Sequence, residues 1–147
     1  MRSGLSKAGL TEAFRSAGFR ITRQRELVFD YLSGLKGVHP SARQIYEALK
    51  DRHAGISVAT VYNTLGALAR LGMIKVIEFE SLDNRYELNL QAHINLVCTS
   101  CGDIRDLHST PMIHTRCAME EMNFTVEDFR LEYYGTCSGC ASGKVLS

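Results

Sequence analysis

Residues 57–70 have the sequence SVATVYNTLGALAR, and this stretch decides the fold of the first half of the chain. Ser57 is a favoured N-cap residue, so a helix is expected to begin directly after it. Four apolar side chains fall within roughly 80° of one another at 100° per residue, which predicts one buried helix face. They are Val58, Val61, Leu65 and Leu68.

The opposite face of this helix is small, polar and basic. Its residues are Ala59, Asn63, Gly66 and Arg70, flanked by Thr60 and Tyr62. A face of this kind can enter the major groove of DNA, which is about 12 Å wide, without steric conflict. The alternative is an ordinary solvated face.

Three further helices are expected upstream, because apolar residues recur there at helical spacing between breakers and caps. The first covers about residues 7–17, the second begins after Thr22 and ends near Gly34, and the third covers residues 42–50 after His39-Pro40-Ser41.

Two segments rich in branched residues, 73–80 and 85–90, follow the fourth helix and are separated by a turn-like cluster at 81–84. They predict a β-hairpin. Helix, helix, capped helix and hairpin is the element order of a winged helix-turn-helix, in which the second helix of the pair contacts base edges.

Charge is divided unevenly along the 147 residues. Residues 1–77 carry 12 Lys and Arg against 5 Asp and Glu, whereas residues 78–147 carry 5 against 11. A positive field on one half attracts a polyanion, so the first half is expected to be the nucleic-acid side; merely uneven surface charge is the alternative. No apolar run reaches the roughly 18–20 residues of a membrane span, and residues 1–7 lack the apolar run of a signal peptide, so we expect a cytoplasmic protein with no membrane partner.

Two C-x2-C pairs dominate the second half of the chain. They are Cys98 with Cys101 and Cys137 with Cys140, separated by 35 residues. Two-residue spacing turns both sulfurs of a pair toward one point, and two pairs complete the tetrahedron that Zn²⁺ prefers. Redox-active disulfide pairs are the alternative. Four thiolates leave no open position, so this zinc is expected to be structural, and Cys117 is expected to be a small buried hydrophobe.

The rest of the second half is of mixed type, with strands expected at 94–97, at 104–107 and around 129–133, and a helix at 112–122. The predicted fold class is therefore α+β. A winged-helix DNA-binding domain at 1–90 precedes a small α/β domain at 91–147, which holds the four-cysteine zinc site and serves metal binding and dimerisation.

Five motifs together resemble the ferric-uptake-regulator (Fur) family, most closely its peroxide-sensing (PerR) branch. Their residues are 18–25 (GFRITRQR), 39–42 (HPSA), 57–65 (SVATVYNTL), 98–102 (CTSCG) and 130–135 (RLEYYG) before 137–140 (CSGC). Each motif alone is weak, but their order and spacing over residues 8–141 are specific. The resemblance implies a homodimeric repressor that binds palindromic operators on double-stranded DNA when a regulatory metal is in place.

The resemblance also implies DNA contacts by the fourth helix and by one upstream arginine. Tyr62 and Asn63 are expected to contact bases, with Ser57 and Thr60 beside them, and Arg20 to contact the adjacent backbone or minor groove. Asn63 can pair with adenine through two hydrogen bonds and Tyr62 can contact a thymine methyl, although contacts to phosphate alone are the alternative.

A regulatory metal site at the hinge between the halves is a further implication. Its ligands, carried over by position, are His39, Glu87, His93 and Asp106. Imidazole with carboxylate suits Fe²⁺, Mn²⁺ or Zn²⁺. Taken singly, His39 could instead cap a helix, and Asp106 could pair with Arg105 or Arg130. Metal binding only to the closed form would shift the protein toward the DNA-binding state.

Asn95 departs from the family pattern, because an amide stands where a second imidazole is expected. An amide oxygen binds first-row metals weakly, so the site has four protein ligands, recruits water or prefers another metal. Asp106 resembles the peroxide-sensing branch and Glu87 the iron-sensing one. We expect peroxide sensing through Fe²⁺ or Mn²⁺, with iron, zinc, manganese or nickel regulation as the alternatives.

Two other classes of protein remain as rivals. A zinc-dependent enzyme would use the same histidines and carboxylates, but the chain has no H-E-x-x-H arrangement and no glycine-rich substrate loop, so we expect no enzyme. A zinc-ribbon interaction module without a DNA role conflicts with the charge division and with the helix at 57–70.

Overall fold

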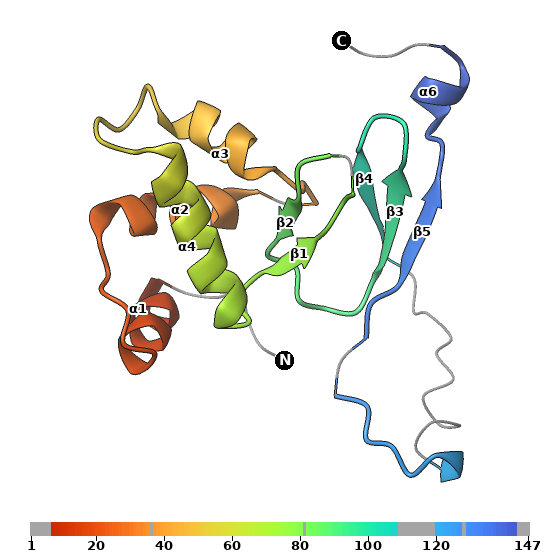
Figure 1. Cartoon of the computed structure of the whole chain (residues 1–147), viewed down its shortest axis with the longest axis horizontal. Helices are drawn as coiled ribbons and strands as arrows, with labels where there is room; N and C mark the ends of the chain where they lie inside the picture. The colour runs from red at the N-terminus through yellow and green to blue at the C-terminus, as the bar shows by residue number, and fades with distance from the viewer. Residues whose placement is uncertain (1–6, 36, 81, 109–119, 128, 144–147) are drawn as a thin grey trace. The chain divides into compact units, whose positions relative to one another are not determined.

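A computed structural model describes residues 7–35, 37–80, 82–108, 120–127 and 129–143 of the chain (Figure 1). The chain divides into two compact units, Met1–Leu90 and Gln91–Ser147. In the described residues, the first unit is helical with a two-stranded sheet, and the second holds a three-stranded sheet and a short helix. The α+β class predicted from the sequence is confirmed.

Four helices of the first unit have the bounds α1 Lys7–Ser16, α2 Arg23–Gly34, α3 Ala42–Leu49 and α4 Val58–Arg70. Local capping explains where three of them begin. The Thr22 side chain accepts from the Arg25 N–H and the Ser57 side chain accepts from the Thr60 N–H, as the sequence predicted. Ser41 forms a reciprocal capping box with Gln44 at the start of α3.

The core of the first unit lies among these four helices and the residues that follow α4. Fully buried side chains come from every helix, including Phe14 of α1, Phe29 of α2, Ile45 of α3 and Leu65 of α4. One member of the apolar face predicted for α4 differs, because Val58 is 41% exposed. Val58 is the first residue of the helix, and the first buried side chain of α4 is that of Val61.

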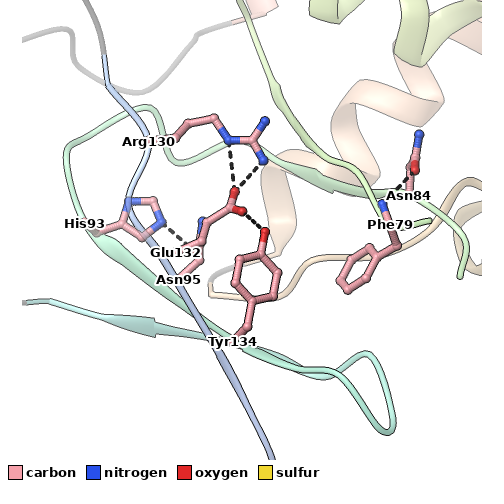
Figure 2. A network of polar contacts seen from close by, with 7 residues as sticks. All are labelled: Phe79, Asn84, His93, Asn95, Arg130, Glu132 and Tyr134. Carbon is pink, nitrogen blue, oxygen red and sulfur yellow. Dashed lines mark hydrogen bonds and ion pairs between the residues drawn. The ribbon is translucent and has the colours of Figure 1, made fainter. Parts of the chain in front are cut away.

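The wing is shorter than predicted. Strands β1 Lys75–Ile77 and β2 Arg85–Glu87 pair antiparallel, with Val76 opposite Tyr86. Met73 and Ile74 do not extend β1 because they are buried in the helical core. The Phe79 N–H donates to the Asn84 Oδ1 at 3.3 Å, which ties the two ends of the turn together (Figure 2).

In the second unit, β3 Ile94–Cys98 is the middle strand of the sheet (Figure 1). It pairs antiparallel with β4 Ile104–Leu107 and parallel with β5 Glu132–Gly135. The short helix α6 Ser138–Ala141 follows β5. The order of the predicted strands is confirmed, although β5 begins later than the pattern at 129–133 suggested.

Part of the helix predicted at 112–122 lies outside the described residues, as does Cys117. Residues 120 and 121 are helical. Within the part of the chain that the structure describes, no helix is both long enough and apolar enough to cross a membrane.

Candidate functional site

The four cysteine sulfurs predicted to hold zinc lie together in the second unit, all within 4.8 Å of one another. Cys98 ends β3 and Cys101 lies in the turn that follows, while Cys137 directly precedes α6 and Cys140 lies within it. The Sγ atoms of Cys98 and Cys140 are 3.9 Å apart, and those of Cys101 and Cys137 are 3.8 Å apart. Sulfurs at about 2.3 Å from a tetrahedral ion are about 3.8 Å apart, so the arrangement fits Zn²⁺.

The same four sulfurs are too far apart for disulfides, whose S–S bond is about 2.05 Å, and all four cysteines are free. The Cys137 N–H donates to the Cys98 Sγ at 3.3 Å and lowers the pKa of Cys98 to about 6. By contrast, hydrogen bonding to the Cys137 side chain raises the pKa of Cys140 to about 12. Crowded sulfurs cannot all be thiolates without a cation, which is the charge that a bound metal supplies.

His39 and Glu87 form a buried pair within the first unit. The Tyr86 N–H donates to the Pro40 carbonyl at 3.0 Å, and Ser41 forms a bridge with Arg85, so the segment before α3 lies along β2. This places His39 Nε2 at 3.5 Å from Glu87 Oε1, with both side chains at most 3% exposed. Because Ser41 caps α3, the alternative of a capping role for His39 is wrong.

His93 and Asp106 form the corresponding pair within the second unit. His93 precedes β3, and Asp106 of β4 is paired with Asn95. The His93 Nε2 lies 3.9 Å from the Asp106 Oδ1, with both side chains at most 5% exposed. Arg105 pairs with Asp103 and Arg130 with Glu132, which are the ion pairs seen for these two arginines in the described residues.

Asn95 contacts the same histidine. Its Oδ1 lies 3.1 Å from the His93 Nε2, a contact drawn as a dashed line in Figure 2. The other ring nitrogen, Nδ1, lies 2.7 Å from the Gln91 carbonyl. A carbonyl can only accept, so Nδ1 carries a proton. In the neutral ring, Nε2 therefore holds the lone pair and is the nitrogen available to a metal.

Glu132 of β5 lies opposite Asn95 in the sheet register. Arg130 and the Tyr134 hydroxyl donate to its carboxylate (Figure 2). Burial raises the pKa of Glu132, but these hydrogen bonds outweigh it, and the pKa lies below its usual value. The carboxylate is thereby held as an anion on β5, an outer strand of this sheet.

The predicted DNA-contacting residues of α4 lie on its outer face. Ser57, Tyr62 and Asn63 are exposed, with Tyr62 at 47%, and Thr60 is half-buried. Thr60 is also held in place, since its hydroxyl lies 2.9 Å from that of Ser57. The first half of α4 thus exposes several polar side chains to a partner.

Arg20 is exposed in the loop between α1 and α2, and two further arginines, which were not among the predicted DNA contacts, support that loop. The Arg25 guanidinium donates to the Arg20 carbonyl and lies 5.8 Å from the Phe19 ring. Arg70, at the end of α4, lies 5.2 Å from the same ring. These cation–π contacts join the Arg20 loop to α4.

Comparison with known proteins identifies relatives over most of the chain. The sequence model of the ferric uptake regulator family matches residues 16–134. The peroxide-responsive repressor PerR of Staphylococcus epidermidis is 35% identical over 129 residues, which are 87% of this chain and 85% of that protein.

Solved structures agree with this result. The Vibrio cholerae ferric uptake regulator, whose DNA-binding domains are described as rearranged, has a TM-score of 0.71 and 29% identity over 87% of this chain and 99% of that one. The Pseudomonas aeruginosa ferric uptake regulator with manganese has a TM-score of 0.71 and 25% identity. The match covers 87% of this chain and 97% of that one.

Proposed function

Because this chain belongs to the ferric uptake regulator family, we propose that it is a metal-dependent, DNA-binding transcriptional repressor that responds to peroxide. One observation carries the proposal. The unit that presents the polar face of α4 also contains a buried His39–Glu87 pair, so a metal ligand set and a candidate DNA surface share one folded body. In this proposal, residues 1–90 form the DNA-binding domain and residues 91–147 the metal-binding dimerisation domain.

Zn²⁺ is the metal proposed for the four cysteines. Its role is structural, because four sulfur ligands complete the tetrahedron and leave no position for a substrate. The sulfur separations of 3.8 and 3.9 Å support this assignment.

Fe²⁺ or Mn²⁺ is the regulatory metal in the proposal, held by His39 and Glu87 from one unit and His93 and Asp106 from the other. Two imidazoles with two carboxylates are a harder donor set than four thiolates and suit these ions. A relative with manganese supports the choice. The ion would supply positive charge and, as Fe²⁺, one-electron chemistry.

The positions of the proposed metal ligands couple metal binding to DNA binding. Glu87 ends the second strand of the wing and His39 precedes α3, so both are fixed to the body that carries α4. When these side chains and those of His93 and Asp106 share one ligand, the two units adopt one mutual arrangement. A metal ion that binds only to this arrangement shifts the population of molecules toward it.

Recognition of the operator is assigned to the exposed half of α4. Asn63 donates to and accepts from an adenine edge, Tyr62 contacts a thymine methyl, and Ser57 and Thr60 contact phosphate. Arg20 extends from its loop to the adjacent backbone or minor groove. Two such helices in a dimer reach successive major grooves about 34 Å apart.

The dimer is proposed to form through the sheet of the second unit. Among the described strands, in the order β4-β3-β5, strand β5 lies at an edge, where backbone groups can pair with a further strand. Alternating residues put Leu96, Leu107 and Tyr133 on one sheet face, and they are 37%, 40% and 53% exposed. Exposed apolar side chains grouped on an open sheet favour a second copy of the chain as occupant.

Peroxide sensing is tested by operator binding of protein loaded with Fe²⁺ or Mn²⁺, before and after peroxide, on an operator selected from random duplexes. The iron form should lose binding and gain oxygen on peptides containing His39 or His93 by mass spectrometry, while the manganese form keeps binding. Equal survival of both forms would contradict peroxide sensing but leave metal-dependent repression intact.

A further inference from the structure

A second imidazole lies on the same face of the second unit's sheet as His93 and Asp106. Asn95 and Asp106 are register partners, and Ile94 is paired with Leu107. Continuing this antiparallel pairing by one residue puts His108 opposite His93. The ring centroids of the two histidines are 6.3 Å apart, with an interplanar angle of 43°.

We propose that His108 is a further ligand of the regulatory metal, supplying the second imidazole of the second unit. This proposal rests on the metal-dependent function argued above and deepens it. His93, Asp106 and His108 then form a nitrogen and oxygen ligand set on the β3–β4 hairpin alone.

The ring separation permits a shared ion. A first-row metal lies about 2.1 Å from each imidazole nitrogen, so two rings on one ion have centroids no more than roughly 6.5 Å apart. The observed 6.3 Å lies within this limit. His108 is exposed and follows the last residue of β4, so rotation of its side chain can bring it closer to His93.

Lone pairs already converge beside this position. The His93 Nε2 lies 3.1 Å from the Asn95 Oδ1 and 3.9 Å from the Asp106 Oδ1. The Asn95 and Asp106 oxygens are acceptors, and the His93 Nε2 beside them presents a lone pair when a metal replaces its proton, so a cation at this position would be stabilised. The amide of Asn95 is a weak ligand for such a cation, and the His108 imidazole is a strong one.

Sequence reasoning gave His108 no role because the pairing of β3 with β4 is needed to find it. The two histidines are separated by the whole cysteine turn, and nothing local connects them.

The test measures Mn²⁺ binding to the full, zinc-loaded chain by calorimetry and counts coordinated imidazole nitrogens by pulsed EPR. His108→Ala should weaken Mn²⁺ binding about tenfold or more and remove one nitrogen coupling. His53→Ala, the same change at a half-buried histidine of the first unit, should alter neither quantity.

A rescue variant separates ligation from a structural role. Asn95→His in the His108→Ala background puts an imidazole back on the same sheet face, and should restore both the nitrogen coupling and the affinity. Wild-type affinity and nitrogen count in His108→Ala, or no recovery in the double variant, would overturn the role of His108. Absence of any Mn²⁺ binding with nitrogen coupling in the wild type would instead overturn the proposed function, and with it this inference.

Discussion

Single side chains decide what each proposed site can bind. The cysteines could be predicted as metal ligands because the C-x2-C spacing itself brings two sulfurs to one point. The pair of His39 and Glu87 could not be predicted from spacing, since 47 residues separate them in sequence. They meet because the hydrogen bond from Tyr86 to Pro40 and the bridge between Ser41 and Arg85 hold the segment before α3 along β2.

Asn63 gives the most specific prediction for DNA recognition. If its amide contacts an adenine edge, Asn63→Ala should lose about 1–3 kcal/mol of affinity for the selected operator while affinity for random duplex changes little. Fluorescence anisotropy on both duplexes measures the difference. Asn84→Ala, in the wing turn, is the matched control. An equal loss on both duplexes would show that Asn63 contacts phosphate and carries no sequence information.

Cysteine substitutions test the zinc assignment. Cys137→Ser removes one of the four sulfurs and should reduce bound zinc well below one ion per chain, with loss of the thermal stability of the second unit. Cys117→Ser is the control, because the sequence predicts a small buried hydrophobe at that residue and not a ligand, and it should keep one zinc. Metal analysis by mass spectrometry provides the measurement. Full zinc content in Cys137→Ser would refute the four-cysteine site.

At the level of elements, helix starts were predictable and strand ends were not. Thr22 and Ser57 signal their helices locally, because a side-chain oxygen satisfies a backbone N–H of the first turn. The strand pattern at 73–80 gave a longer strand than β1, because branched residues suit a buried core as well as a strand. Burial of Met73 and Ile74 depends on the helices around them, which no local pattern reveals.

The capping box of α3 yields a stability prediction. Ser41→Ala removes the acceptor for the Gln44 N–H and should lower the free energy of unfolding by about 0.5–2 kcal/mol. For a unit of this size, each kcal/mol lowers Tm by about 4–8 °C. Ser33→Ala is the control, since its hydroxyl bonds only to the Phe29 carbonyl within α2, and it should change Tm much less. Calorimetry of both variants provides the comparison, and equal shifts would mean that the cap contributes no stability.

On the scale of the whole molecule, the proposed dimer depends on the open sheet of the second unit. Tyr133→Lys adds a charge to the exposed apolar face and should weaken self-association, measured by sedimentation equilibrium. Val38→Lys changes an equally exposed apolar residue of the first unit and should leave association unchanged. Similar dimer dissociation constants for the two variants would argue against this face.

The central claim is that ligands from both units share one metal and that this sharing sets DNA affinity. Its most direct test is the Mn²⁺ dependence of operator affinity in the zinc-loaded wild type, in Glu87→Gln and in Asp106→Asn. Mn²⁺ should raise wild-type affinity by roughly 5- to 150-fold, the usual range of coupling between sites, and either variant should lose most of this gain. A wild type whose operator affinity is the same with and without Mn²⁺, or a gain that survives in both variants, would contradict the account.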